Sequence, residues 1–177
     1  MLGEKMTANN LARLICRVAN GDNRALELLY LKTARGVYAF LYTYLHNHAD
    51  TEDAMQTVYL KIKKGAGSFK AGTNGRAWIL QIAKNHALDV LRQKRYDLPI
   101  ESVANTCANN SFSDQTVMNA MQKVLTEEEQ QIIALHVLWG YKHREIAQTL
   151  NVPTGTITSK YKRSIEKLKT ALKGVDL

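Results

Sequence analysis

The sequence predicts an all-α protein made of two small helical domains joined by a flexible linker. Apolar residues recur at helical spacing along most of the chain, and capping and stop residues divide it into separate helices. Basic residues fall into two blocks: residues 54–96 hold nine Lys and Arg with one acid, and residues 130–173 hold eight with two acids, whereas residues 97–122 hold none. We therefore predict one domain over residues 1–95, a linker over residues 96–115 and a second domain over residues 116–177.

Four helices are predicted in the first domain. They are expected at residues 11–19, at residues 24–45, from Asp50 or Thr51 as N-cap to Lys64, and at residues 76–95. Between the third and fourth helices, four glycines over residues 65–75 indicate an irregular loop with Phe69 near its centre.

The last helix of the first domain has a polar outer face. On a helical wheel its apolar side chains form one broad arc that packs on the preceding helices, and His86 falls within this arc as a predicted core histidine. Gln81, Asn85 and Arg92 project the other way, with Trp78 beside them. Aromatic rings stack on unpaired bases, amides bond to base edges and cations follow the backbone, so this face suits single-stranded DNA. Trp78 fits a structural wedge against the loop equally well.

Residues 125–172 predict three helices, of which the last two form a helix-turn-helix. Thr126 and Glu129 make a capping box for the first helix. A short amphipathic helix over residues 144–150, a tight link and a long helix that begins at Pro153 follow it. The long helix has a polar, basic face, which the second helix of such a unit needs in order to enter the major groove of DNA. The alternative is a packed helical hairpin whose charges are merely solvated.

Composition and motifs exclude several functions. The formal net charge of +8 favours an anionic partner, either nucleic acid or an acidic protein surface. No apolar run approaches the roughly 20 residues that span a bilayer, and the N-terminus has no signal-peptide pattern, so we expect a cytoplasmic protein without membrane insertion. Cys16 and Cys107 belong to no metal or redox motif, and no paired-carboxylate, nucleophile or phosphate-loop motif is present. We therefore expect no enzyme activity, catalytic residue, metal or cofactor.

The segment GRAWILQIAKNHALDVLRQKR, preceded by DTEDAMQTVYLKIKK and followed by the helix-turn-helix, resembles the extracytoplasmic-function (ECF, group 4) sigma factors of bacterial RNA polymerase. The likeness covers residues 11–172. It implies a first domain, sigma region 2, that binds core polymerase and opens the minus-10 promoter element. It implies a second domain, sigma region 4, that binds the minus-35 element as duplex, and a linker that runs through the polymerase toward its active centre and RNA exit path.

The resemblance, together with the polar faces described above, gives three sets of expected contact residues. The polymerase-binding set is Asp53, Gln56, Thr57, Val58 and Tyr59. The set for the melted minus-10 strand is Lys63, Lys64, Phe69, Arg76, Trp78, Gln81, Lys84, Asn85 and Arg92. The set for the minus-35 duplex is Arg144, Thr154, Thr156, Ser159, Lys160, Lys162 and Arg163.

The sequence departs from the family pattern at the start of the helix-turn-helix. Lys142 stands where relatives have a small hydroxyl cap, and Arg144 occupies an acidic position. Both changes add positive charge near the duplex, and the lost cap weakens the helix start by about 1 kcal/mol. The loop over residues 65–75 also has more glycine and fewer aromatic residues than many relatives.

The expected partners are core RNA polymerase, promoter DNA as duplex and as melted non-template strand, and an anti-sigma protein of the kind that commonly inhibits this group. Two alternative functions remain open. One is a helix-turn-helix transcriptional regulator in which residues 1–95 sense a ligand. The other is a protein that acts only by binding another regulator through its basic faces.

Overall fold

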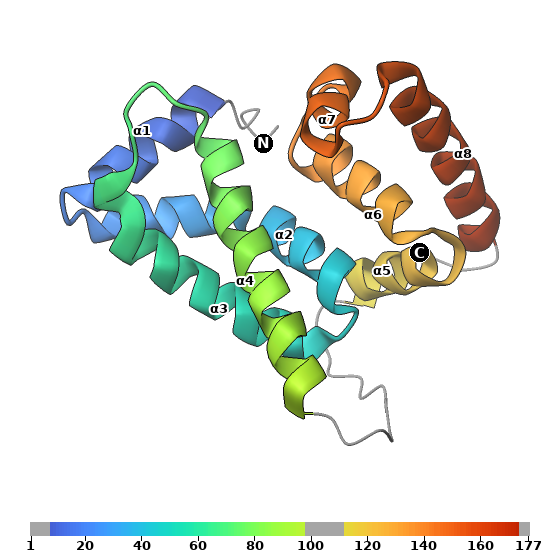
Figure 1. The fold of residues 1–177 in the computed structure, drawn as a ribbon, viewed down its shortest axis with the longest axis horizontal. Coiled ribbons are helices and arrows are strands. Elements are labelled where there is room, and N and C mark those ends of the chain that lie inside the picture. The colour runs from blue at the N-terminus through green and yellow to red at the C-terminus, as the bar shows by residue number, and fades with distance from the viewer. Residues whose placement is uncertain (1–7, 98–111, 174–177) are drawn as a thin grey trace. The chain divides into compact units, whose positions relative to one another are not determined.

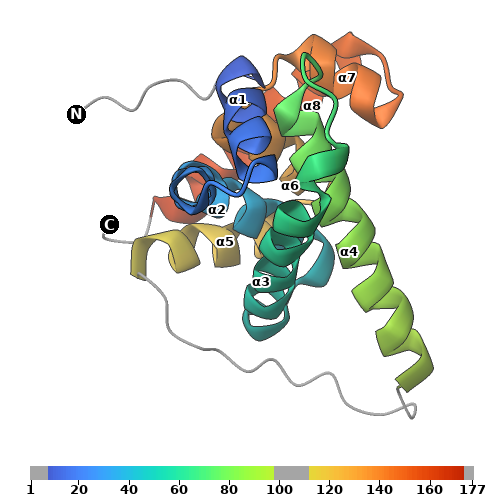
Figure 2. The same cartoon turned by 90° about the vertical axis from the view of Figure 1, so that its left-hand side faces the viewer.

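The computed structural model describes residues 8–97 and 112–173, and every regular element in these two ranges is helical (Figure 1 and Figure 2). The chain divides into two compact units, Met1–Thr106 and Cys107–Leu177, which we call the N-terminal and C-terminal units. The predicted all-α fold of two small helical domains is confirmed. The elements are α1 (Ala8–Ala19), α2 (Asn23–Leu45), α3 (His48–Gly65), η1 (Ala66–Ser68), α4 (Gly75–Asp97), α5 (Phe112–Val124), α6 (Glu127–Ile133), η2 (Ala134–Leu138), α7 (His143–Leu150) and α8 (Thr154–Leu172).

α2 is the central helix of the N-terminal unit. It packs against α1, α3 and α4 (Figure 1), and Leu29, Val37 and Leu41 on its inner face are completely buried. A buried hydrogen bond of 2.7 Å joins the Thr33 hydroxyl to the Tyr59 hydroxyl of α3. Apolar burial therefore supplies the attraction between these helices, and the polar pair adds a directional contact within it.

α3 begins earlier than predicted. The Asn47 side-chain oxygen accepts a hydrogen bond of 3.1 Å from the Asp50 N–H, so Asn47 is the N-cap of a helix that starts at His48. The predicted caps, Asp50 and Thr51, lie within the first turn instead. There the Asp50 carboxylate is favoured by the positive end of the helix dipole.

α3 and α4 lie side by side, joined by the loop predicted over residues 65–75 (Figure 2). Asn74 caps α4, because its side-chain oxygen accepts hydrogen bonds of 3.1 and 3.3 Å from two N–H groups of the first turn. Gly75, the first residue of α4, lies against the backbone of α1: a Cβ there would be 2.7 Å from the Ala12 nitrogen. Only glycine permits this approach of two backbones.

α8 is the helix on which the C-terminal unit is assembled. It packs against α5, α6 and α7, with Ile157 completely buried. α6 continues into η2, a π-helical stretch in which the Trp139 N–H donates to the Ala134 carbonyl five residues earlier, at 3.3 Å. α7 ends at Leu150, and its C-cap is Asn151, whose φ of 55° is the left-handed conformation that asparagine tolerates. α7 and α8 form the predicted helix-turn-helix.

The linker predicted over residues 96–115 lies mostly outside the described residues. α4 extends to Asp97, and α5 begins at Phe112. Helical backbone therefore enters the predicted linker from both of its ends.

We expect Gly75→Ala to destabilise the N-terminal unit by about 1–3 kcal/mol, because the added methyl group has to displace the backbone of α1. Gly67→Ala is the matched control, since a Cβ at Gly67 meets nothing within 4 Å. Urea unfolding of the full chain, followed by circular dichroism, measures both variants. Equal unfolding midpoints for the two variants would show that the close approach of α1 and α4 is not required.

Candidate nucleic-acid and polymerase interfaces

The outer face of α4 carries the predicted single-strand contacts. Gln81, Lys84, Asn85 and Arg92 are all exposed. The Gln81 side-chain amide donates a hydrogen bond of 2.8 Å to the Asn85 side-chain oxygen one turn later. The structure thus brings two amides and two cations onto one solvent-facing surface, as the helical wheel predicted.

Phe69 in the loop before α4 is turned inward. Its side chain is 8% exposed, and its ring centroid lies 5.3 Å from that of Trp78 in an edge-on arrangement. Trp78 is half-buried and lies 3.7 Å from the position of a Cβ at Gly65. Trp78 therefore packs against the loop, as the structural interpretation of this residue predicted, while part of its indole ring remains accessible to solvent. The flanking Ser68 and Lys70 are exposed, but the Phe69 ring is not presented to solvent.

The remaining predicted minus-10 residues lie at the end of α3 and the start of α4. Lys63 and Lys64 are exposed on the last turn of α3, and Arg76 is half-buried in the first turn of α4. The predicted set therefore extends from the end of α3 along α4, and Phe69 is its only buried member.

His86 is half-buried beside α3, not in the core as predicted. The Lys61 ammonium group donates a hydrogen bond of 3.2 Å to His86 Nδ1, which requires that nitrogen to be unprotonated. Burial lowers the pKa of His86 below its ordinary value, and the Lys61 charge lowers it further. The wheel placed His86 on the apolar arc of α4, but the structure shows that this edge of the arc faces a polar side chain of α3.

The predicted polymerase-binding residues of α3 divide into two groups. Asp53 and Gln56 are exposed and Thr57 is half-buried on the outer face, whereas Val58 is completely buried and Tyr59 is 8% exposed. Val58 and Tyr59 therefore hold α3 in place, and the other three side chains form the accessible surface.

Tyr59 is fixed by two contacts with α2. Its hydroxyl is bonded to Thr33, and its ring lies edge-on to Tyr30 with the centroids 4.8 Å apart. Burial raises the pKa of Tyr59 above its ordinary value, despite the opposing effect of the hydrogen bond to Thr33. Tyr59 is therefore neutral at physiological pH, and its hydroxyl can act as a donor.

Leu60 was missed by sequence reasoning. Its side chain is 59% exposed, and its position seven residues after Asp53 places it on the same outer face as Asp53, Gln56 and Thr57. The sequence signal for Leu60 is an apolar residue at a position that helical spacing places on the polar outer face of α3. The accessible surface of α3 therefore combines a carboxylate, an amide and a leucine.

α8 presents the predicted minus-35 residues unevenly. Thr154, Ser159, Lys162 and Arg163 are exposed, as is Arg144 on α7, whereas Thr156 and Lys160 are half-buried. The Arg163 side chain folds back toward its own helix, with Nε donating to the Ser159 carbonyl at 3.4 Å.

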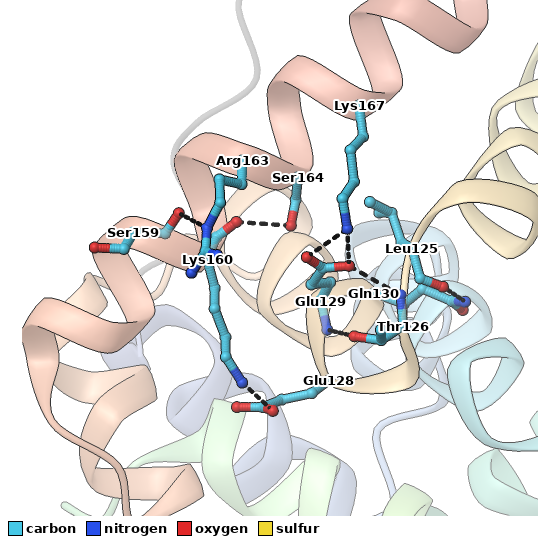
Figure 3. A network of polar contacts seen from close by, with 10 residues as sticks. All are labelled: Leu125, Thr126, Glu128, Glu129, Gln130, Ser159, Lys160, Arg163, Ser164 and Lys167. Carbon is cyan, nitrogen blue, oxygen red and sulfur yellow. Dashed lines mark hydrogen bonds and ion pairs between the residues drawn. The ribbon is translucent and has the colours of Figure 1, made fainter.

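Lys160 and Lys167 are turned from α8 toward the start of α6 (Figure 3). Lys160 forms an ion pair with Glu128. The Lys167 ammonium group lies 2.9 Å from both carboxylate oxygens of Glu129. Lys160, predicted to contact the minus-35 duplex, therefore already has an acidic partner within its own unit.

Glu129 connects α6 and α8. Its carboxylate accepts from the Thr126 N–H at 3.0 Å, and its own N–H donates to the Thr126 hydroxyl at 3.3 Å, which confirms the predicted capping box. Burial by itself raises the pKa of Glu129, but the hydrogen bonds from Lys167 and from the Thr126 backbone outweigh it and hold the pKa below the ordinary value. The charged carboxylate thus caps one helix and fixes another.

The start of α7 keeps half of a capping box. Lys142 at the N-cap makes no side-chain hydrogen bond to the helix, but Glu145 reaches back and accepts from the Lys142 N–H at 2.7 Å. This contact offsets part of the cap loss predicted from the sequence.

Three aromatic rings hold the helix-turn-helix together, a feature that sequence reasoning did not identify. The His136, His143 and Tyr161 rings, from η2, α7 and α8, have mutual centroid distances of 4.7, 4.6 and 5.0 Å. His143 Nδ1 also lies 3.1 Å from the Thr158 hydroxyl of α8. These contacts fix the start of α8 relative to α7.

Within residues 8–97 and 112–173, no cluster of three or more His, Cys, Asp or Glu side chains could hold a metal ion. In the same part of the chain, no helix has both the length and the apolar character needed to cross a membrane.

Comparison with known families identifies both units. Residues 29–96 match Sigma-70 region 2, and residues 123–170 match Sigma-70, region 4. These two modules, in this order, define a sigma-factor architecture, and together the matches span about two thirds of the chain. The chain therefore belongs to the sigma-70 family. The match to region 2 also removes support for a ligand-sensing N-terminal domain.

Individual relatives agree with this assignment. The chain is 25% identical to the RNA polymerase sigma-H factor of Pseudomonas aeruginosa, over 94% of this chain and 96% of that protein. It is 26% identical to the RNA polymerase sigma factor CarQ of Myxococcus xanthus, over 91% of this chain and 97% of that protein. It is also 26% identical to the ECF RNA polymerase sigma factor SigM of Mycobacterium tuberculosis, over 96% of this chain and 88% of that protein.

Solved structures share the fold. The sigma factor RpoE from Bartonella quintana, in complex with the anti-sigma factor NepR, superposes with a TM-score of 0.61 at 25% identity, covering 85% of this chain and 98% of that chain. CnrH, in complex with the cytosolic domain of CnrY, gives a TM-score of 0.61 at 18% identity, covering 93% of this chain and 98% of that chain.

We expect Glu129→Gln to destabilise the C-terminal unit by about 1–2 kcal/mol near neutral pH, because it removes the charge that binds Lys167. Since the folded-state pKa of Glu129 lies below its ordinary 4.5, the stabilisation is complete above that value and is lost as the pH falls through the folded-state pKa. Urea unfolding at neutral pH and at about pH 3 measures this difference. Glu166→Gln, at an exposed carboxylate of α8, is the control. If Glu129→Gln lowers the free energy of unfolding equally at both pH values, the stabilisation does not come from the charged Glu129 carboxylate.

Proposed function

We propose that this protein is a group 4 ECF sigma factor that acts in the cytoplasm. It binds core RNA polymerase, positions the enzyme through duplex contacts at the minus-35 element and stabilises the melted minus-10 element. One observation carries this proposal: the chain combines a match to region 2 with a match to region 4, and each of the two regions has a different exposed polar surface. One, on α4, suits unpaired bases, and the other, on α8, suits the groove of a duplex.

The α4 surface would hold the melted strand without bond-breaking chemistry. Gln81 and Asn85 bond to base edges, and Lys84 and Arg92 neutralise phosphates. Unstacking costs a few kcal/mol per base step, and stacking on an aromatic ring returns about 1–3 kcal/mol per base. In the described conformation Phe69 supports Trp78, so a base captured by Phe69 itself would require the loop to open.

The α8 surface would bind the duplex through its first turns. Thr154, Thr156 and Ser159 lie where the second helix of a helix-turn-helix reaches base edges, and Lys162 and Arg163 lie where it meets phosphates. Arg144 adds a backbone contact from α7. Lys160 would join these contacts only by leaving Glu128.

The outer face of α3 would dock on the polymerase. Asp53, Gln56 and Thr57 supply its polar contacts, and we add Leu60 as an apolar contact at its end. Val58 and Tyr59 are buried and would contribute to polymerase binding only indirectly, by holding α3 in position. We propose that an anti-sigma protein competes for this surface, because the related RpoE was solved in complex with the anti-sigma factor NepR.

The proposed function is tested by run-off transcription with the purified chain, core polymerase and a library of genomic promoters. We expect initiation from a small set of promoters that core polymerase alone does not use. Failure of the purified chain to direct initiation from any of them would overturn the proposal.

We expect Asn85→Ala to reduce open-complex formation roughly tenfold while sparing polymerase binding, because one base contact is worth about 1–3 kcal/mol. Permanganate footprinting measures the open complex, and a pull-down of core polymerase measures binding. Asp53→Ala is the crossed control, for which polymerase binding should fall. A loss of both properties in Asn85→Ala would count against the role given to α4.

We expect Arg163→Ala to weaken binding to the upstream duplex and to make its salt dependence shallower by about 0.9 in log affinity against log salt, the contribution of one phosphate contact. Fluorescence anisotropy of holoenzyme with a labelled upstream duplex measures the slope. Lys169→Ala removes an exposed charge from the last turn of α8 and should leave the slope nearly unchanged. An unaltered slope in Arg163→Ala would contradict the phosphate contact.

A further inference from the structure

The contacts proposed so far involve only one residue, Arg92, of a groove between α3 and α4. It has a volume of about 410 Å³ and is lined by Lys61, His86, Asp89, Arg92 and Gln93. Pockets that hold small ligands begin at about 300 Å³, so the groove is large enough for part of a nucleotide. Four of its five lining residues belong to α4, whose outer face carries the proposed strand contacts.

Two cations in this groove converge on one carboxylate. Lys61 Nζ lies 4.0 Å from one Asp89 carboxylate oxygen, and Arg92 Nη1 lies 3.3 Å from the other. All three side chains are about half exposed or more, and ion pairs in such positions contribute little to stability. Stability therefore does not account for the arrangement. Two cations that converge on one anion can, however, both form charge-assisted contacts with a phosphodiester group.

The other lining groups suit the rest of a nucleotide. His86 Nδ1 accepts from Lys61, so in the neutral ring Nε2 carries the proton and can donate. The Gln93 amide offers both a donor and an acceptor. The groove thus combines two cations with neutral hydrogen-bonding groups.

The position of the groove fits a strand that follows α4. Trp78 and Arg92 are separated by about 21 Å along a helix of this length, with Asn85 halfway between them. A DNA strand that runs along α4 and contacts Trp78 and Asn85 would therefore also reach the groove at Arg92.

We propose that this groove holds one phosphodiester group of the melted DNA strand between Lys61 and Arg92, in place of the Asp89 carboxylate. Asp89 acts as a resident anion that orders the two cations before DNA arrives and is displaced from them by the phosphate. The proposal rests on the proposed function and adds Lys61 and Asp89 to the strand-binding surface. An acidic segment of a protein partner would satisfy the same two cations, and the test separates it from DNA.

The test uses holoenzyme formed from core polymerase and the full chain, bound to a promoter recovered from the library with its minus-10 region left unpaired. We expect Lys61→Gln to weaken binding roughly fivefold and to make the salt dependence shallower by about 0.7, the value for one contact on a single strand. Lys61→Arg should retain both. We expect Asp89→Asn to strengthen binding, because its two cations become available to the phosphate.

Matched controls are Arg24→Gln and Glu27→Gln, which remove one exposed cation and one exposed carboxylate from α2. If the Lys61 and Asp89 variants behave like these controls while the wild-type chain initiates transcription, the groove proposal is wrong and the proposed function stands. If Lys61→Gln weakens core polymerase binding and leaves DNA binding unchanged, the groove holds an acidic protein segment and the DNA proposal is overturned. If the wild-type chain directs no initiation, both proposals fail.

Discussion

The buried contact between Tyr59 and Thr33 sets the rotation of α3, and both surfaces of that helix depend on it. The two hydroxyls lie 2.7 Å apart, with Thr33 completely buried. When Tyr59 points inward, the helical period directs Leu60 to solvent and Lys61 toward α4. A rotation of α3 by one residue, about 100°, would expose Tyr59 and bury part of the proposed polymerase contact. One core contact therefore positions the residues proposed to bind the polymerase and the residue proposed to bind the DNA strand.

Internal carboxylates order the cations of both units. Asp89 lies between Lys61 and Arg92 in the N-terminal unit, and Glu128 holds Lys160 in the C-terminal unit. In a chain of net charge +8, unrestrained lysines would bind any polyanion. Exposed ion pairs of this kind add little stability, so a phosphate can replace the carboxylate at small cost. In the proposed function, the pairs would restrain the side chains before binding and would favour DNA that offers several phosphates at once.

Features that depend on near neighbours in sequence could be predicted, and features that depend on distant neighbours could not. Helical periodicity and the Thr126–Glu129 capping box involve residues within four positions of each other, so the all-α class, the helix-turn-helix and the outer face of α4 followed from the sequence. The Lys61–His86 contact joins residues 25 positions apart, and the Lys160–Glu128 pair joins residues 32 apart. A helical wheel gives the direction of a side chain on its own helix but not the identity of the residue that faces it. The inward orientation of Phe69 was likewise not predicted, because it depends on the contact with Trp78, nine positions later in the chain.

The loop before α4 illustrates how a small energetic balance could serve the proposed function. Phe69 packs on Trp78, and exposing such a ring costs about 1.5–3 kcal/mol. Stacking of an unpaired base on an aromatic ring returns about 1–3 kcal/mol. Gly72, with a φ of 86° and open space around it, provides a point at which the backbone is not held by side-chain packing. Because the two energies are similar, exchange of the Phe69–Trp78 contact for a Phe69–base contact is close to neutral. Capture would then depend on how well the base stacks, so small differences in stacking free energy between promoter sequences would decide whether the base is held.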